Sequence, residues 1–251
     1  MEAVGVKVKR VKVLNVPVDM VDPEMAVKAV EELLESGQQH QIVFLNLTGL
    51  LRARRDPEFT RCIREAAIVL PVSLAIVNGA RFLDAGRLSL FNSFEFIIRL
   101  LSLLEKSKGT VYLLGSEKRT LETAEENLLG SFHGIRVVGR FYGYFPKEIE
   151  GNIITAIKKS SPNLILVGKG VVGKDKWILR HKKDFNPGIS LWVGNCFEVF
   201  SGREKQTSRK LHAVGLGGLS GIWRRPWRIL RVFSYLRYFA LLVIYRVFRL
   251  Q

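Results

Sequence analysis

The apolar residues of the first 200 positions fall into short runs separated by longer amphipathic stretches. The short runs, rich in Val, Ile and Leu, lie at 11–16, 42–45, 66–70, 110–114, 135–138, 164–167 and 189–193. The stretches with a helical period lie at 23–36, 48–55, 94–106, 116–129, 147–159 and 174–184. Apolar strands that alternate with helices are typical of a buried parallel sheet with helical crossovers. The pattern therefore predicts an α/β fold with a Rossmann-like, mostly parallel sheet and flanking helices.

Small and polar residues follow several of the predicted strands. They are Asn46, Pro71, Gly115 with Ser116, the segment 168–173, and Gly194 with Asn195. Ligands of open parallel sheets bind beyond the carboxyl ends of the strands, so these positions are candidates for a binding site. A glycine after a strand can also serve only to make the turn. Both interpretations stay open for each position.

One glycine-rich segment, Gly168-Lys-Gly-Val-Val-Gly173, lies between a predicted strand and a predicted helix. It matches the dinucleotide pattern GxGxxG, but it comes late in the chain, and no acidic residue is clearly placed to hold a ribose. Backbone N–H groups at a helix start nevertheless attract phosphate, and Lys169 and Lys174 add positive charge. The segment therefore predicts either a phosphate or diphosphate ligand or a plain tight turn.

Positive charge is concentrated near the C-terminus. The chain has a net charge of +16, and residues 203–251 contain eleven Lys and Arg against one acid, Glu204, which gives that segment +10. Such a surface favours anionic lipid, nucleic acid or phosphorylated ligands. Within it, the glycine-rich stretch 215–221 is typical of a flexible joint. We therefore predict an α/β domain over 1–202 and a basic, aromatic, membrane-associating appendage over 203–251.

Arginine and aromatic residues alternate beyond these glycines. The longest uncharged run, 238–245, is far shorter than the ~20 residues that cross a bilayer. The composition is that of an amphipathic helix lying on an anionic membrane surface. The residues expected to bind the membrane are Trp223, Arg224, Arg225, Trp227, Arg228, Arg231 and Arg237. A helix that packs on its own domain or on a partner subunit is an alternative, whereas the Leu-Leu-Val-Ile run disfavours a nucleic-acid partner.

The cysteines, the histidines and the N-terminal residues indicate which kinds of site and segment the protein is expected to lack. Two cysteines, Cys62 and Cys196, exclude a disulfide framework, and the four histidines form no HxxxH or HxH pair, so we expect neither a metal site nor a cofactor. Residues 1–12 are charged and lack the apolar core of ~7–15 residues that a signal peptide carries. We therefore expect a peripheral protein with neither a signal peptide nor a transmembrane segment.

Several longer motifs occur in order from about residue 10 to 240. They are Ile42-Val-Phe-Leu-Asn46 with Arg54-Arg-Asp-Pro57, Gly109-Thr-Val-Tyr-Leu-Leu-Gly115, Val138-Gly-Arg-Phe-Tyr-Gly-Tyr-Phe-Pro146, Ser161-Pro-Asn-Leu-Ile-Leu-Val-Gly-Lys-Gly170, Trp192-Val-Gly-Asn-Cys-Phe-Glu-Val-Phe-Ser-Gly202 and Arg225-Pro-Trp-Arg228. Together they resemble the WecG/TagA/CpsF glycosyltransferases (glycosyltransferase family 26), of which this chain would be a divergent member.

The resemblance implies a reaction and a location. Members of this family move an N-acetylhexosamine-type sugar from a UDP donor to a polyprenyl-diphosphate-linked sugar in cell-surface polysaccharide synthesis. They work at the cytoplasmic face of the cell membrane, where a basic C-terminal appendage docks them on lipid. The implied partners of this chain are thus a UDP-sugar, a polyprenyl-diphosphate-linked sugar and an anionic membrane surface.

The chain departs from the family where protons and charges are handled. Val72 stands at the position of the Asp proposed as general base, and valine cannot accept a proton. Phe44 replaces a Thr, Leu90 replaces an Arg, and Lys174 replaces a Gln. The resemblance therefore leaves open whether catalysis survives in this chain.

Two acids remain as candidate catalytic residues, Glu95 and Asp175. The residues expected to bind the nucleotide sugar are Asn46, Gly115, Gly168, Lys169, Gly170, Lys174 and Glu198. Glu95 can instead serve only as a first-turn carboxylate of a helix, and Glu198 only as a helix cap. Two functions stay open: a divergent but active glycosyltransferase, and a catalytically degraded relative that acts as a binding or scaffold protein at the membrane.

Overall fold

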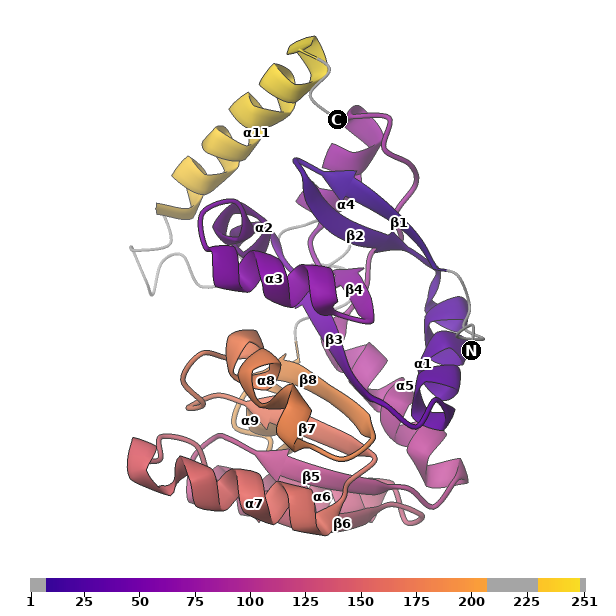
Figure 1. Ribbon diagram of the computed structural model, residues 1–251, viewed down its shortest axis with the longest axis vertical. Coiled ribbons are helices and arrows are strands. Elements are labelled where there is room, and N and C mark those ends of the chain that lie inside the picture. The colour runs from indigo at the N-terminus through magenta and orange to yellow at the C-terminus, as the bar shows by residue number, and fades with distance from the viewer. Residues whose placement is uncertain (1–7, 207–229, 249–251) are drawn as a thin grey trace.

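The computed structural model describes residues 8–206 and 230–248, with the side chains of the second segment described from Phe233 onward. Its centre is a six-stranded sheet in which every pair of neighbouring strands is parallel (Figure 1). The strand order is β4-β3-β8-β7-β5-β6. The strands are β3 Gln39–Leu45, β4 Ile68–Pro71, β5 Thr110–Leu114, β6 Arg136–Phe141, β7 Leu164–Gly168 and β8 Gly188–Gly194. The predicted α/β fold with a parallel sheet is confirmed.

Helices cover both faces of the sheet. The helices of one face, called face A here, are α1 Pro23–Glu35, α5 Ser93–Lys106, α6 Lys118–Ser131 and α9 Cys196–Phe200. The helices of the other, face B, are α2 Leu47–Ala53, α3 Pro57–Glu65, α7 Glu150–Ser160 and α8 Asp175–His181, with the short turns η1 Lys147–Ile149 and η2 Lys182–Asp184. Successive strand residues point to opposite faces. Both sets are largely buried, as a doubly covered sheet requires.

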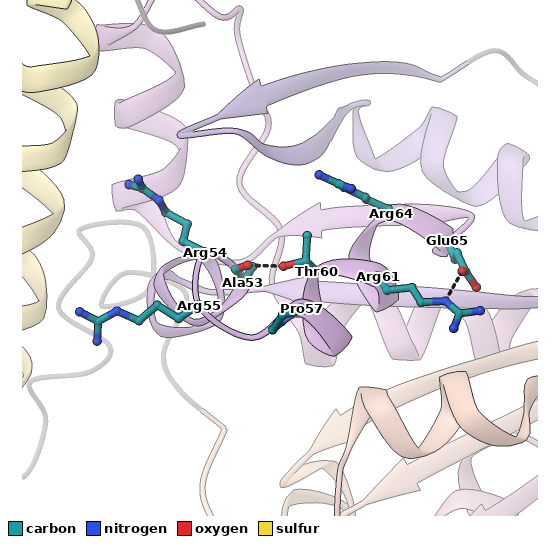
Figure 2. Close-up of a pocket in the computed structure, with 8 residues that line it drawn as sticks. All are labelled: Ala53, Arg54, Arg55, Pro57, Thr60, Arg61, Arg64 and Glu65. Carbon is teal, nitrogen blue, oxygen red and sulfur yellow. Dashed lines mark hydrogen bonds and ion pairs between the residues drawn. The ribbon is translucent and has the colours of Figure 1, made fainter.

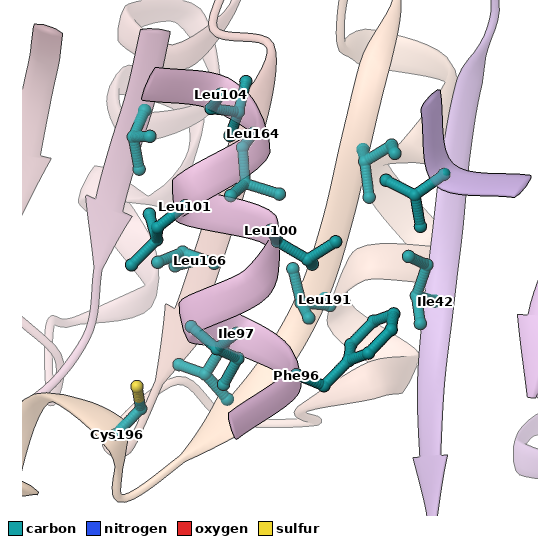
Figure 3. Packing of buried hydrophobic residues seen from close by; sticks show 14 of the residues in the cluster. Ile42, Phe96, Ile97, Leu100, Leu101, Leu104, Leu164, Leu166, Leu191 and Cys196 are labelled. Carbon is teal, nitrogen blue, oxygen red and sulfur yellow. The ribbon is translucent and has the colours of Figure 1, made fainter. Parts of the chain in front are cut away.

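The core on face A is built around α5. Its residues Ile97, Leu100 and Leu101 are at most 1% exposed. They pack over Leu166 of β7 and Leu191 of β8, as Figure 3 shows. Burial of each such side chain stabilises the fold by about 1.5–3 kcal/mol, so this layer fixes α5 and the residues at its start.

The predicted single strand at 11–16 was wrong, because the chain turns in its middle. The structure has a hairpin of two antiparallel strands, β1 Lys9–Val13 and β2 Val16–Met20. Leu14 and Asn15 form the turn with φ values of 51° and 66°. A two-residue hairpin turn of type I′ requires this left-handed backbone at both positions. Asparagine adopts it readily, but the valines on both sides of the turn resemble one continuous strand.

An ion pair joins the two strands of this hairpin, and its carboxylate also connects the hairpin to the edge of the sheet. Arg10 Nε lies 2.6 Å from Asp19 Oδ1, and the Asp19 side chain is 1% exposed. Asp19 Oδ2 also accepts a hydrogen bond of 2.7 Å from the backbone N–H of Val69 in β4. Since an open edge strand invites unwanted pairing, the hairpin protects β4.

Three helices of the described chain were absent from the predicted pattern: α3, α4 Leu74–Phe82 and the five-residue α9. Asp56 caps α3 by accepting a 3.0 Å hydrogen bond from Phe59 N, and Pro57 occupies the first turn. This Asp-Pro signal also starts α1, where Asp22 caps the helix. The signal was therefore available at α3, but a helix of nine residues offers little periodicity to support it.

The C-terminal helix α11, Leu230–Phe248, packs on α2 and α4 through one of its faces. Tyr238, Leu242 and Tyr245 on that face are at most 8% exposed. Tyr238 Oη donates a 2.9 Å hydrogen bond to the carbonyl of Ala75 in α4. It lies next to Gly79, which has no side chain that would obstruct it. The buried face of α11 therefore belongs to the same core as the hairpin, α2 and α4.

Tyr245 joins α11 to two further elements. Its hydroxyl accepts hydrogen bonds from Asn15 Nδ2 at 3.0 Å, in the hairpin turn, and from Arg54 Nη2 at 3.2 Å, at the end of α2. The guanidinium of Arg54 lies 5.1 Å from the ring centroid, within the range of cation–π attraction. Packing on its own domain, one of the alternatives left open by the sequence, is thus observed for this helix.

The opposite face of α11 is apolar and exposed. Phe233, Leu236, Phe239, Val243 and Val247 are between 39% and 68% exposed. Across 8–206 and 230–248, no helix combines the length and the apolarity needed to cross a membrane.

Of the residues expected to bind a membrane, Arg237 is half-buried on α11, while Trp223, Arg224, Arg225, Trp227 and Arg228 lie outside the described residues, as does the side chain of Arg231. The glycine-rich stretch 215–221 also lies outside the described residues. The predicted domain division after residue 202 stays a prediction.

Candidate functional site

The residues that follow the central strands meet at one edge of the sheet. Asn46 follows β3, Asn195 follows β8, Lys169 follows β7 and Ser116 comes just after β5, in the order of the strands. The chain leaves β3 toward face B through α2, but it leaves β8 toward face A through α9. Where connections diverge from neighbouring parallel strands, a crevice opens in which such sheets bind ligands. The candidate site therefore lies at the carboxyl ends of β3 and β8.

The side chain of Asn46 caps a helix at this edge of the sheet. Its Oδ1 accepts a 2.7 Å hydrogen bond from Gly49 N and so caps α2; a cap of this kind stabilises a helix by about 1 kcal/mol. The residue is exposed, so it caps the helix while standing at the crevice. Val72 lies beside it, because its N–H donates to the Leu45 carbonyl at 2.9 Å. The Val72 side chain packs against the core of face A and has no group that takes a proton.

Backbone hydrogen bonds connect the glycine loop after β7 to its neighbours. Ser116 N donates to the Lys169 carbonyl at 2.5 Å, and Tyr144 N donates to the Gly170 carbonyl at 2.9 Å. Gly143 N in turn donates to the Ser116 carbonyl at 2.7 Å. The loops after β5, β6 and β7 are thus packed into one unit.

Close packing explains two of the glycines in this unit. Gly115 has a φ of +124°, and a Cβ there would lie 2.8 Å from the Gly168 carbonyl carbon. A Cβ on Gly168 would lie 2.5 Å from a ring carbon of Phe197. Both distances are shorter than real side chains tolerate, so these glycines are needed by the fold, whether or not a ligand binds above them.

A polar cluster surrounds Lys169. Its Nζ lies 2.7 Å from Glu204 Oε1 and 3.6 Å from Glu198 Oε2. Glu198 Oε1 accepts a 2.8 Å hydrogen bond from Ser116 Oγ, and Glu204 Oε2 accepts one of 2.5 Å from Asn195 Nδ2. The charge of Lys169 is therefore already balanced by two carboxylates. A diphosphate that used this lysine would have to compete with Glu204.

The two lysines of the glycine loop point to different sides of the sheet. Lys169 pairs with Glu198 of α9, on face A. Lys174 Nζ lies 5.7 Å from the ring centroid of Trp192, whose side chain packs on face B. They flank the loop rather than converging on one ligand position.

Asp175 is a buried carboxylate at the start of α8. The residue is 8% exposed, and Oδ1 has no hydrogen-bond partner among the described residues. Its backbone carbonyl accepts hydrogen bonds from Gln41 Nε2 at 3.0 Å and Cys62 Sγ at 3.4 Å, which places it between α8, β3 and α3. Burial raises the pKa of Asp175 to about 7, against the opposing charges of Lys174 and Arg52. It is thus an acid that changes charge near neutral pH.

Glu95 lies in the first turn of α5, as the helix-start alternative predicts. Asn92 Oδ1 caps this helix and accepts hydrogen bonds from Phe94 N at 3.1 Å and Glu95 N at 3.3 Å. The start of α5 is held at the carboxyl end of β4, since Phe91 N donates to the Pro71 carbonyl at 2.9 Å. Glu95 therefore lies near the carboxyl edge on face A, whereas Asp175 is buried on face B beside Gln41, the third residue of β3.

Glu204 is the site residue that the sequence analysis missed. Its pairing with Lys169 and Asn195 anchors the start of the C-terminal segment at the candidate site. The available signal was its isolation, because Glu204 is the one acid among the eleven Lys and Arg of residues 203–251.

Comparison with known proteins gives a consistent result. The profile of the glycosyl transferase WecG/TagA/CpsF family matches residues 11–251. A Bacillus subtilis relative named N-acetylglucosaminyldiphosphoundecaprenol N-acetyl-beta-D-mannosaminyltransferase is 23% identical over 188 residues, which are 74% of this chain and 72% of the relative. A Staphylococcus aureus protein of the same name is 24% identical over 174 residues, 68% of each chain.

The family match therefore extends from the hairpin to the last residues of the chain. It includes the sheet edge that carries Asn46 and Lys169, Asp175 at the start of α8, and the helix α11 that packs on the domain. The resemblance inferred from the motifs is confirmed. The chain belongs to the WecG/TagA/CpsF family of glycosyl transferases.

Proposed function

We propose that this protein transfers an N-acetylhexosamine-type sugar, of which N-acetylmannosamine is the first choice, from a UDP donor to a polyprenyl-diphosphate-linked sugar. The observation that carries the proposal is the family match over 11–251, together with relatives that are named as N-acetylmannosaminyltransferases acting on a diphosphoundecaprenol-linked sugar. The product would serve the synthesis of a cell-surface polysaccharide.

The donor would bind at the crevice between β3 and β8. We place the UDP group over the loop 168–173, close to Asn46, because N–H groups at the start of a helix favour phosphate. Lys174 provides a cation that has no carboxylate partner among the described side chains. Lys169 lies on the other side of the loop, where Glu204 and Glu198 already balance its charge.

Asp175 is the best candidate for the group that takes the acceptor's proton. In the reaction, the hydroxyl oxygen of the acceptor sugar forms a bond to the anomeric carbon, the bond to UDP breaks, and the hydroxyl proton must leave. An acid whose pKa lies near neutrality is suited to this role, and burial gives Asp175 that pKa. Its Oδ1 is buried and has no hydrogen-bond partner among the described residues. Glu95 is the second candidate.

The enzyme would work at the cytoplasmic face of the membrane, where its lipid-linked acceptor resides. The C-terminal segment supports this location through its net charge of +10 and through the exposed apolar face of α11. Residues Trp223 to Arg231 stay the expected lipid-binding part of that segment.

Val72 supports a second candidate function. The position of the family's proposed base is filled by a side chain that packs in the core of face A. A protein that kept the fold and lost proton transfer would bind a lipid-linked sugar or a partner enzyme at the membrane without turnover.

Product formation separates the two functions. The full-length protein is mixed with UDP-N-acetylmannosamine and a short-chain polyprenyl-diphosphate-N-acetylglucosamine, and the disaccharide product is measured by mass spectrometry. Calorimetric titration with UDP is run on the same sample. UDP binding with product supports the transferase, and UDP or acceptor binding without product supports the non-catalytic function. Neither binding nor product at millimolar ligand would refute both.

A further inference from the structure

A basic groove lies along α2 and α3. It has a volume of about 650 Å³. It is lined by four arginines and one acid, Arg54, Arg55, Arg61, Arg64 and Glu65, together with Ala53, Pro57 and Thr60. Figure 2 shows Arg54 and Arg55 extending from the end of α2 toward the side on which α11 lies, with Arg64 projecting from α3. Arg55 and Arg64 are exposed.

The acids of this segment do not neutralise the groove. Asp56 and Glu58 form ion pairs with cations of α8, and Glu65 pairs with the arginine one turn before it. Arg55 and Arg64 form no ion pair with any carboxylate of the described chain. The groove thus holds guanidinium groups whose charge has no carboxylate counterpart, and guanidinium is the side-chain group best matched to phosphate oxygens.

The groove adjoins the inner face of α11, the face that packs on the domain. Arg54 bridges the two, since its guanidinium stacks on the Tyr245 ring and donates to the Tyr245 hydroxyl. On the far side of the same helix, Phe233, Phe239 and Val247 project away from the domain. Basic side chains beside an apolar helix face form the pattern of a protein that rests on an anionic bilayer.

We propose that the α2–α3 groove binds phosphate-bearing headgroups of an anionic membrane, with the outer face of α11 entering the adjoining interface. The site is additional to the C-terminal residues 223–231. The inference rests on the membrane location under the proposed function, but not on catalysis. It orients the protein on the membrane through its folded domain as well as through its C-terminal segment.

The test compares two double variants that lose the same charge. The double variant Arg55→Gln, Arg64→Gln removes the two arginine charges of the groove that have no carboxylate partner. It keeps Arg54, which packs on Tyr245. Arg119→Gln with Arg136→Gln is the control, because both are exposed arginines on α6 and β6, toward the opposite edge of the sheet. Binding of the full-length proteins is measured by sedimentation with phosphatidylcholine vesicles, either alone or containing phosphatidylglycerol. Thermal melting and UDP titration are measured on all proteins.

We expect the groove variant to bind phosphatidylglycerol vesicles roughly 30-fold more weakly, because each arginine near an anionic leaflet contributes about fivefold. The control should lose far less, and binding to neutral vesicles, melting temperature and UDP affinity should be unchanged. Equal losses in the groove and control variants would overturn the proposal. So would unchanged vesicle binding accompanied by a change in oligomeric state, which would assign the groove to a second copy of the chain. Failure of UDP binding in all proteins would count against the proposed function alone.

Discussion

Among single residues, Asp175 has the clearest consequence for stability. Burial raises its pKa in the folded protein to about 7, from an ordinary value of 3.8. The folded state therefore binds the proton more tightly than the unfolded state does, and the stabilisation present at low pH is lost as the pH rises through 7. A difference of about three pKa units corresponds to about 4 kcal/mol.

We expect Asp175→Asn to remove this pH dependence. The variant should be more stable than the wild type by up to about 4 kcal/mol at pH 8, and the two should be alike near pH 4. Urea unfolding across this range measures the difference. Asp184→Asn, at an exposed acid of the adjacent η2 turn, is the matched control. A wild type whose stability does not fall between pH 4 and pH 8 would show that Asp175 is not held neutral by burial.

Val72 allows a prediction about the chemistry. Val72→Asp restores a carboxylate at the position of the family's proposed base, and a positioned base is worth roughly 100- to 10,000-fold in rate. The variant should therefore turn over faster than the wild type. Val72→Asn is the control, because asparagine has the shape of aspartate but cannot accept the proton. It should give no gain in rate. If Asp and Asn act alike at this position, the base is supplied from elsewhere.

At the scale of elements, the docking of α11 depends on the absence of a side chain at Gly79. A Cβ at this position would collide with the hydroxyl of Tyr238. Gly79→Ala should displace α11, cost roughly 1–3 kcal/mol as overpacking usually does, and speed hydrogen exchange across 233–248. Gly130→Ala is the control, because a Cβ on this glycine of α6 meets nothing within 4 Å. Unchanged exchange in α11 would mean that Tyr238 does not hold the helix.

The central elements were predictable because their signals are local. The runs 110–114 and 164–167 are fully apolar, and the period of 94–106 has a clear buried side, so β5, β7 and α5 were found nearly to the residue. The hairpin was missed because a turn at Leu14 and Asn15 interrupts an apolar pattern without a glycine or proline. The docking of α11 was left open because its outer face is as apolar as its buried face.

The site was predictable only in part. Asn46 and Lys169 were identified by position after strands, and both follow a strand at the carboxyl edge of the sheet. Asp175 was identified from the family resemblance. The pairing of Lys169 with Glu204 joins residues 35 positions apart. The burial that perturbs Asp175 depends on β3 and α3, which are distant in sequence. Neither effect leaves a local pattern in the sequence.

At the scale of the whole molecule, one face of α11 is part of the core. Ending the chain at Gly217 removes Tyr238, Leu242 and Tyr245, each at most 8% exposed, from the packing against α2 and α4. The truncated protein should melt at a lower temperature, by roughly 2–4 °C for each kcal/mol lost, and expose apolar surface. Calorimetry on the full-length and truncated proteins measures this. An unchanged melting temperature would show that α11 contributes nothing to the fold.

The most direct test of the proposed transferase is the rate of sugar transfer by the wild type and Asp175→Asn, measured with UDP-N-acetylmannosamine and a polyprenyl-diphosphate-N-acetylglucosamine acceptor. We predict product from the wild type, and a rate at least about 100-fold lower in the variant with unchanged affinity for UDP and no loss from Asp184→Asn. No product from a wild type that is folded and binds UDP would contradict the assignment as an active glycosyltransferase.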